Sequence, residues 1–467
     1  MSAGHPSTAQ LETLAEQALE RCVGEAQVSV SHERSLLSRF ARSQPTQATG
    51  IDALHVEIMC VYEGHTGAAT TTSCAVGDLE TTAAAARAAA EAAANAAGSV
   101  GDYPGLPAPD PHWRAQPHDG FDAATAAVDP GSAGRALQDA AGVAAEHRTE
   151  AFGTWTAGAV RTAIASTTGV RVTDAVTDAY MRVLCYRPDG RSGFAARSAR
   201  DAAQLDGAAL TGEAAAKAIV AGVPAVLAPG EYAVVMEPEA IGELLGFAGA
   251  LAFNGLAHNE GRGALAGRLG ARVAAAAINL ADAPRASLTL PRAFDAEGIP
   301  KRPIPLIQDG VAHAVVHDTR SAARAGPGAR STGHALAPGG DPDGPVPTNL
   351  VLSGGGAADV AELCAPIVRG IYVTRLWYVN TVRERETLLT GMTRDGTFLI
   401  EDGRIGRPLR DVRFTDSVLR LLDAIEALTK TQRLVSAGDF YGPRFAFGVV
   451  SPALRARGFR VSGTTPG

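Results

Sequence analysis

The chain has 467 residues, of which 46% are hydrophobic and 19% charged, so it has globular composition and enough length for about three folding units. Its 42 basic and 49 acidic side chains leave a formal charge of −7 without a long Lys and Arg stripe, which argues against a nucleic-acid partner. The five widely spaced cysteines, the polar start and the lack of a long apolar run predict a cytoplasmic protein without a signal peptide or membrane span.

The first hundred residues predict a helix, three strands of an antiparallel meander and a second helix. The apolar spacing predicts helices over 10–23 and 79–97, and alternation predicts strands over 28–43, 54–64 and 66–74, with turns at Gly50 and over 63–67. Six prolines between 102 and 132 then predict a linker, because proline density of this kind fits neither a helix nor a central strand.

The middle of the chain repeats the same order of elements without a visible residue-level repeat. Its predicted elements are a helix over 133–147, strands over 151–167, 169–186 and 192–201, and a helix over 206–221. The order predicts a second helix–strands–helix unit.

Beyond residue 229 the pattern predicts a strand-rich domain that starts with a strand over 231–238 and a helix over 237–257. Further strands are predicted at 286–291, in a hairpin over 305–318 with its turn at Asp309-Gly310, and in four later segments, with helices near Asp359 and over 416–427. The predicted fold class is α+β with antiparallel or mixed sheets. The predicted divisions are 1–101, the linker 102–132, 133–228 and the C-terminal domain 229–467.

Motifs that would carry chemistry are scarce. The metallopeptidase pattern H-E-x-x-H is absent, and His313 and His317 share one face of the predicted hairpin without a third ligand, so two structural histidines are the simpler interpretation. The triplet 354–356 lacks the rest of a phosphate-binding loop, neither Ser353 nor Ser451 has the flanking glycines of a nucleophile elbow, and Cys364 fits a buried helical position. The aromatic run Tyr372, Trp377 and Tyr378, with Arg375, fits a binding wall or core packing.

Several blocks taken together resemble the TldD/PmbA family of cytoplasmic peptidases, and the resemblance covers most of the chain. The blocks are Glu237-Pro238-Glu239-Ala240, Leu244-Leu245, Glu260-Gly261-Arg262, 294–300, 305–310, His317-Asp318-Thr319, 347–350, 370–374 and GMTRDGTFLIEDG at 391–403. The N-terminal strands, with Leu37-Ser38-Arg39-Phe40 and Thr70-Thr71-Thr72, resemble the family more weakly.

Catalytic subunits of that family carry H-E-x-x-x-H on the corresponding helix and a further zinc-binding cysteine near the C-terminus. Here the resemblance aligns Gly246, Phe247 and Leu251, give or take one residue, with those three helical ligand positions. No cysteine follows Cys364, and the aligned C-terminal stretch offers only Asp439 and Tyr441. Because zinc needs three or four placed N, S or O donors, the resemblance implies that this chain binds no metal and has no catalytic residue.

The resemblance therefore implies a TldE/PmbA-like subunit, inactive by itself, in a heterodimer with a zinc-bearing TldD-like chain. Such a pair would enclose an unstructured peptide, which a strand-rich domain can bind by main-chain pairing. Six residues are candidates for the lining of this space or for the interface, and they could equally hold turns and domain contacts. They are Arg262, Asp295, Glu297, Asn349, Tyr372 and Trp377.

Two alternatives remain at this stage. The Ala- and Arg-rich composition is typical of GC-rich actinobacterial genomes, so the pair could mature a peptide or a natural-product intermediate. A stand-alone regulator that binds peptides, as the family's association with DNA gyrase modulation suggests, would instead form a homodimer without a catalytic partner.

Overall fold

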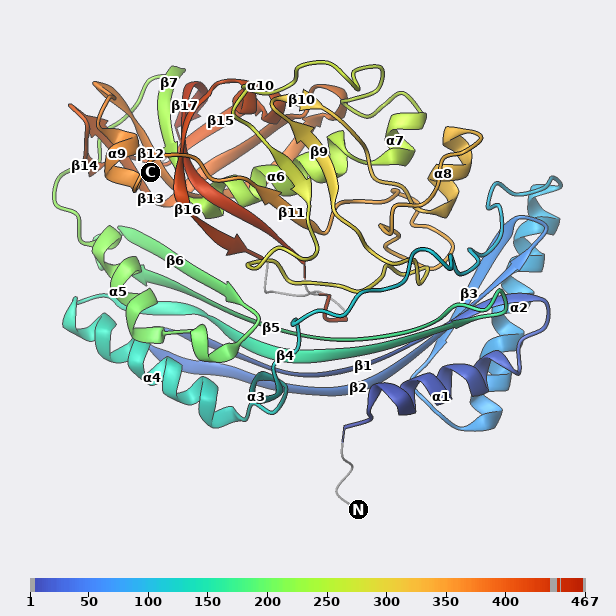
Figure 1. The fold of residues 1–467 in the computed structure, drawn as a ribbon. Coiled ribbons are helices and arrows are strands. Elements are labelled where there is room, and N and C mark those ends of the chain that lie inside the picture. The colour runs from blue at the N-terminus through green and yellow to red at the C-terminus, as the bar shows by residue number, and fades with distance from the viewer. Residues whose placement is uncertain (1–4, 437–442, 446, 465–467) are drawn as a thin grey trace.

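A long curved sheet with helices on its outer face carries a strand-rich domain on its inner, concave face (Figure 1). The computed structural model describes residues 5–436, 443–445 and 447–464. The sheet comes from the first half of the chain and the strand-rich domain from the second half. The predicted α+β class is confirmed.

The first half of the chain forms one six-stranded antiparallel sheet in the order β3-β2-β1-β4-β5-β6. A helix, three strands and a helix occur twice, as the sequence predicts, and the two copies meet where β1 pairs with β4. The elements are α1 (Thr8–Leu19), β1 (Glu25–Ala41), β2 (Gln44–Tyr62), β3 (His65–Thr71), α2 (Val76–Ala97), α3 (Ala123–Ala126), α4 (Pro130–Glu146), β4 (Glu150–Ser166), β5 (Arg171–Tyr186), β6 (Ser192–Ala199), the 3-10 helix η1 (Ala202–Gln204) and α5 (Gly207–Ala218).

One feature recurs in both copies at residue level. Gly67 on β3 pairs with the buried Cys60 on β2, and Gly193 on β6 pairs with the buried Cys185 on β5. A Cβ atom at either glycine would lie 2.1 Å from a backbone atom of the helix above it, α2 or α5. Each helix therefore lies directly on the backbone of its strand, and only glycine fits there.

The turns of the first sheet differ in part from the prediction. Gly50 lies inside β2, so the turn predicted there is wrong. The β1–β2 turn is instead made by Arg42 and Ser43, which have left-handed φ angles of 51° and 58°. Two successive left-handed residues match the twist of a two-residue hairpin, but neither residue type signals this conformation in a sequence. The predicted turn at Asp309-Gly310 is confirmed between β9 and β10.

The second half of the chain forms an eleven-stranded sheet in which β7 pairs with both β12 and β17, so that β17, β15, β13, β12 and β7 close a ring. The elements are β7 (Gly230–Met236), α6 (Pro238–Ala252), α7 (Gly255–Asn259), β8 (Leu280–Asp282), β9 (Ile304–Gln308), β10 (Val311–Ala312), α8 (Thr319–Ala325), β11 (Asn349–Leu352), α9 (Val360–Cys364), β12 (Arg369–Arg383), the 3-10 helix η2 (Glu384–Glu386), β13 (Leu388–Glu401), β14 (Arg404–Pro408), β15 (Val412–Ser417), α10 (Val418–Asp423), β16 (Ile425–Val435) and β17 (Gly448–Thr464).

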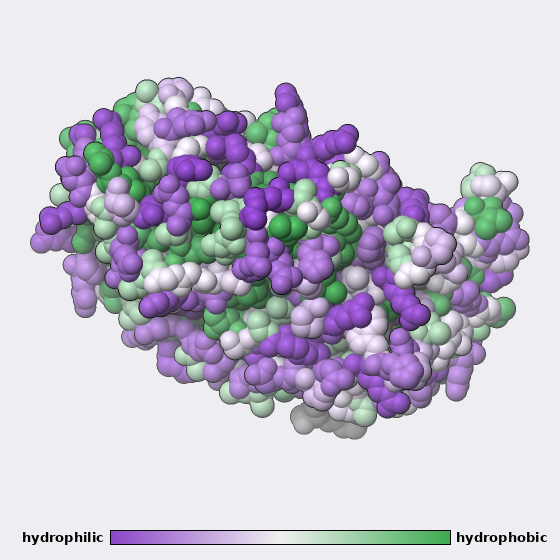
Figure 2. Space-filling model, turned by 45° about the horizontal axis from the view of Figure 1, so that its top comes forward, coloured by the Kyte–Doolittle hydropathy of each residue, from purple (hydrophilic) through white to green (hydrophobic). Residues whose placement is uncertain are grey.

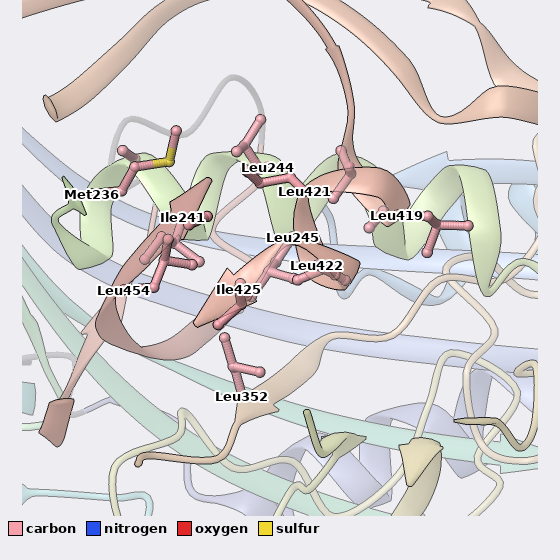
Figure 3. Close-up of a cluster of buried hydrophobic side chains, with 14 of the residues drawn as sticks. Met236, Ile241, Leu244, Leu245, Leu352, Leu419, Leu421, Leu422, Ile425 and Leu454 are labelled. Atoms are coloured by element: carbon pink, nitrogen blue, oxygen red, sulfur yellow. The ribbon is translucent and has the colours of Figure 1, made fainter. Parts of the chain in front are cut away.

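Helix α6 is the centre of the C-terminal core. It begins with Pro238 at its first position, where a missing amide hydrogen costs nothing. One side of the helix buries Ile241, Leu244 and Leu245 against leucines of α10 and β17 (Figure 3). The predicted helix over 237–257 is interrupted, because the side chain of Asn254 accepts a hydrogen bond from the Ala257 amide and starts α7.

Two further predictions in this domain are wrong. The segment 286–291 is no strand, because the Asn349 side chain donates to Thr289 and to the Leu290 carbonyl in place of a ladder. The helix predicted over 416–427 is shorter, and β16 starts at Ile425 and pairs with β17.

Candidate functional site

A cavity of about 750 Å³ lies between the concave face of the first sheet and the C-terminal domain. The sheet contributes side chains of β5 and β6, and the domain contributes α6, β12 and the paired ends of β16 and β17. On the sheet side the lining residues are Tyr180, Arg182, Phe194, Ala196 and Ser198. Ligand pockets commonly form where two such units meet, so this cavity is the first candidate site.

The cavity wall formed by α6 follows from helical spacing. Residues Gly242, Glu243, Gly246, Phe247 and Ala250 line the cavity, and they stand three or four positions apart on one side of the helix. A Cβ atom at Gly246 would meet nothing within 4 Å, so open space lies in front of it. The opposite side of the helix is the one that packs into the core.

A buried ionic cluster fixes the start of α6 against the first half of the chain. Lys217 of α5 lies 2.8 Å from a carboxylate oxygen of Glu237, which also accepts hydrogen bonds from the hydroxyls of Tyr372 and Thr374. Burial by itself lowers the pKa of Lys217, but the carboxylates of Glu237 and Glu213 outweigh it and hold that pKa above its ordinary value. Tyr372, a predicted lining candidate, is therefore a buried member of this cluster, and burial raises its pKa.

Glu239 lies at the edge of the same cluster and lines the cavity. Burial and the neighbouring carboxylate of Glu237 raise the pKa of Glu239 to about 7. Its Oε2 atom is buried and has no hydrogen-bond partner among the described residues. This carboxyl therefore keeps its proton to a higher pH than an exposed glutamate does, which suits a buried polar group with few partners.

Trp377 and Tyr378 form an aromatic wall of the cavity. The register of β12 against β13 shifts between Trp377 and Asn380, and Tyr378 has a left-handed φ of 55°, which marks a β-bulge. The guanidinium of Arg375 lies over the rings of Phe194 (4.5 Å) and Trp377 (5.1 Å). Through the contact between Arg375 on β12 and Phe194 on β6, the C-terminal domain and the first sheet touch at this wall of the cavity.

Residues contributed by β5 and β6 were not among the sequence candidates. Tyr180 and Arg182 occupy alternate positions on β5, and Phe194, Ala196 and Ser198 occupy alternate positions on β6, so each set lies on one face of its strand. The period of two was visible in the sequence, but it does not say which face of the strand meets the other half of the chain.

The described lining of this cavity does not fit a zinc site. Its only acidic donors are Glu239 and Glu243, and none of the described lining residues is His or Cys. Zinc in peptidases takes three protein ligands drawn mainly from His, Cys and carboxylates. Two of the positions aligned with zinc ligands, Gly246 and Phe247, face this cavity, whereas Leu251 packs against the core and is not among the lining residues.

Two predicted candidates, Asp295 and Glu297, lie away from this cavity and bind backbone. Asp295 accepts hydrogen bonds from the amides of Glu297, Ile299 and Ala335 and thereby holds a tight loop. Glu297 is fully buried and accepts from the Thr319 amide and from the hydroxyl of Tyr103. Burial and the charge of Asp295 raise the pKa of Glu297 to about 8.

The other two candidates also hold chain segments together. Asn349 is fully buried, and its side chain binds the irregular segment after β8. Arg262 follows α7 at the surface and forms ion pairs with Glu260 (2.7 Å) and with Glu384 in η2 (3.5 Å). Of the six candidates, only Trp377 lines this cavity.

The segment before β17 is anchored in the first sheet. Asp439 and Tyr441 lie outside the described residues. Arg444 is buried, and its guanidinium donates to both carboxylate oxygens of Asp178 at 2.7 Å and to the Thr156 hydroxyl at 3.0 Å. Its backbone amide donates to Glu33. This contact spans the two halves of the chain next to the cavity.

Other motifs have structural roles. His317 lies 3.2 Å from the Ser321 hydroxyl, and a Cβ atom on Gly355 would lie 2.6 Å from a carbonyl oxygen of β16, so that glycine permits close packing. Cys364 is buried, and burial raises its pKa to about 11.

The described residues contain one group of three side chains with metal-ligand spacing, His5, His32 and Asp52. The guanidinium of Arg34 contacts the His5 ring nitrogen Nε2, and its positive charge disfavours the binding of a metal cation beside it.

Comparisons with known proteins agree with this architecture. A family model described as the PmbA/TldA metallopeptidase C-terminal domain matches residues 229–463. The chain belongs to the PmbA/TldD metallopeptidase family.

The chain is similar in sequence to a protein described as a metalloprotease from Methanothermobacter thermautotrophicus. It is 26% identical over 278 residues, an alignment that covers 59% of this chain and 59% of that protein.

Solved structures of the PmbA/TldD family share the fold over nearly the whole chain. TldE from Thermococcus kodakarensis superposes with a TM-score of 0.84 at 20% identity and covers 98% of this chain and 100% of its own. A protein described as a modulator of DNA gyrase from Thermotoga maritima gives a TM-score of 0.79 at 19% identity, covering 94% and 96% of the two chains. Another described in the same way, from Bacteroides thetaiotaomicron, gives 0.77 at 18% identity, covering 97% and 98%.

Among the described residues, no helix is both long and apolar enough to cross a bilayer. The face of the molecule in Figure 2 alternates hydrophilic side chains with small apolar patches.

Proposed function

We propose that this chain is a non-catalytic, TldE-like subunit that pairs with a zinc-bearing TldD-like chain and helps to enclose an unstructured peptide for hydrolysis. In this arrangement the partner supplies the metal and the chemistry, and this chain supplies one wall of the space in which the peptide lies.

The observation that carries the proposal is the cavity-facing side of α6. A zinc peptidase needs a Lewis acid held by three protein ligands and a base that activates water. The α6 wall offers glycine, alanine, phenylalanine and the carboxyl groups of Glu239 and Glu243 in that place, which are too few donors for zinc. The TM-score of 0.84 to the archaeal TldE supports the same assignment at the level of the fold.

The rest of the cavity suits contact with a peptide that has no fixed sequence. Flat aromatic faces at Phe194, Trp377 and Tyr378 and the guanidiniums of Arg182 and Arg375 can contact peptide groups and apolar side chains. The cavity volume of about 750 Å³ has room for a few residues of extended chain and not for a folded domain.

The test is co-expression of this chain with the TldD-like chain of the same genome, compared with each chain alone. We expect one heterodimer by light scattering, zinc in the partner only, and cleavage of a casein-derived peptide mixture only by the pair. In this chain, Gly246→Trp should fill the cavity and lower cleavage while zinc content and association stay unchanged. Gly134→Trp on the outer helix α4, where no atom lies within 4 Å of the new Cβ, is the matched control.

Two outcomes would reject the proposal. Zinc held by the isolated chain together with cleavage would make it a peptidase in its own right. A stable homodimer that never associates with the TldD-like chain would favour a stand-alone regulator instead.

A further inference from the structure

A second cavity of about 910 Å³ lies elsewhere between the first sheet and the C-terminal domain. The proline-rich segment before α3 forms one wall, the β4–β5 turn forms another, and the loop after Glu297 together with α8 forms the third. In Figure 1 this segment runs between the concave face of the sheet and the region below α8. None of the described residues that line it also lines the first cavity.

The walls of this second cavity are predominantly apolar and flat. Proline rings and the half-buried indole of Trp113 come from the linker, and branched aliphatic side chains come from β5 and from the loop before β9. The larger apolar lining residues are Pro104, Pro107, Pro109, Pro111, Trp113, Val170, Val172, Ile299 and Pro300. Such surfaces favour a ligand with a flat apolar body.

The linker wall is held in place by hydrogen bonds to both halves of the chain. The Thr168 hydroxyl donates to the Pro107 carbonyl at 2.7 Å, and the Tyr103 amide donates to the Gly64 carbonyl at 3.1 Å. The Tyr103 hydroxyl donates to Glu297 of the C-terminal domain. Proline fixes φ in the rest of the segment, so the wall is formed before any ligand arrives and little ordering cost remains.

Of the four guanidiniums at the cavity, two have an ion pair and two have none with the residues that the structure describes. Arg330 lies 3.5 Å from the carboxylate of Asp110. Arg171 lies 3.1 Å from Glu16 and also donates to two backbone carbonyls. The guanidinium of Arg302 lies over the Trp113 ring at 4.3 Å. Arg114 lines the cavity at an exposed position and has no ion pair or side-chain hydrogen bond with a described residue.

We propose that this second cavity binds a small aromatic anion, with the ring system against the proline rings and the branched aliphatic side chains and the carboxylate or sulfonate at Arg114. A volume of about 910 Å³ is in the range of pockets for drug-sized molecules. The guanidinium fork of Arg114 can bind a carboxylate or sulfonate with two hydrogen bonds. The site is separate from the peptide cavity and does not depend on the function proposed for it.

The test uses two naphthalene dyes of nearly equal shape that fluoresce when bound. 1-Anilinonaphthalene-8-sulfonate carries one sulfonate, and N-phenyl-1-naphthylamine carries no charge. We expect the sulfonate to bind the full-length chain with a stoichiometry of one at this site and to bind about tenfold more weakly to Arg114→Gln, the loss expected for one charge-assisted contact near solvent. Binding of the neutral dye to Arg114→Gln should be unchanged.

Three further variants locate the dye. Ala323→Trp, at an exposed position of α8 that lines the cavity, should abolish binding of both dyes here. Arg385→Gln removes an exposed arginine far from the cavity and should change nothing. Gly246→Trp fills the first cavity and should leave the Arg114-dependent binding intact.

The proposal fails if Arg114→Gln and Ala323→Trp bind the sulfonate as tightly as the wild-type chain does. It also fails if only Gly246→Trp abolishes binding, because the dye then occupies the peptide cavity, or if Arg114→Gln weakens both dyes equally. Each variant is checked by circular dichroism and thermal unfolding, so that a folding defect is recognised from the loss of the melting transition.

Discussion

Replacing Arg444 by leucine should destabilise the contact between the two halves of the chain. The side chains of Arg444 and Asp178 are only 2% and 5% exposed, and the guanidinium bonds both carboxylate oxygens. Removing one partner of such a buried pair leaves an uncompensated charge and typically costs about 3–5 kcal/mol. Because Arg292 also interacts electrostatically with Asp178, we expect about 3 kcal/mol, the lower end of that range.

The assay is urea-induced unfolding followed by tryptophan fluorescence, to which Trp155, buried in the first sheet, contributes together with Trp113 and Trp377. Leucine at both Arg444 and Asp178 should recover most of the loss, since an apolar pair replaces the ionic pair without leaving a charge. The control is Arg460→Leu, which breaks a half-exposed pair with Glu231 and should cost less than about 1 kcal/mol. If Arg444→Leu costs no more than Arg460→Leu, or if the double variant is less stable than the single one, the reasoning is refuted.

Three other experiments test the structure elsewhere. The pKa of Glu297 is raised to about 8 in the folded chain, so between pH 5 and 8 the folded state holds a proton that the unfolded state has lost. The wild type should therefore lose about 1 kcal/mol of unfolding free energy per pH unit over this range, relative to Glu297→Gln. Denaturation at several pH values measures this difference. Gly67→Ala should destabilise the chain by about 1–3 kcal/mol through overlap with α2, whereas Gly77→Ala, at an open position of that helix, should be neutral or stabilising in thermal unfolding. The double variant Gly246→His and Ala250→His places two imidazoles one turn apart on the cavity side of α6. It should bind a zinc ion in titration calorimetry. The absence of a heat of binding would mean that an ion cannot reach this face of the helix.

Local patterns predicted most of the elements, because alternation and helical spacing report burial directly. The strand predicted over 169–186 is found at Arg171–Tyr186, and the helix predicted over 79–97 is found at Val76–Ala97. Predictions failed where the conformation depends on distant partners. Arg42 and Ser43 adopt left-handed φ angles because the pairing of β1 with β2 requires a tight turn there. The conformation of 286–291 is fixed by hydrogen bonds from the Asn349 side chain, which is distant in sequence.

The candidate cavity was predicted only in part for the same reason. Trp377 was one of the sequence candidates and lines the cavity, and two of the positions aligned with zinc ligands, Gly246 and Phe247, lie on the cavity side of α6. Phe194 is far from Trp377 in sequence, and only the docking of the two halves brings both rings against Arg375. Charged candidates such as Asp295 were misleading because loops that bind their own backbone amides use the same residue types as binding sites.

The long sheet of the first half is made of two similar arms whose strands pair with each other where β1 meets β4. Each arm produced separately would leave that central strand with a full row of unsatisfied amide and carbonyl groups. Because the joint is antiparallel, a β1 strand could pair with a β1 strand from another molecule in much the same way. A truncated chain that ends before α4 should therefore dimerise or aggregate through this edge, and in the intact chain the second arm prevents self-association by occupying it.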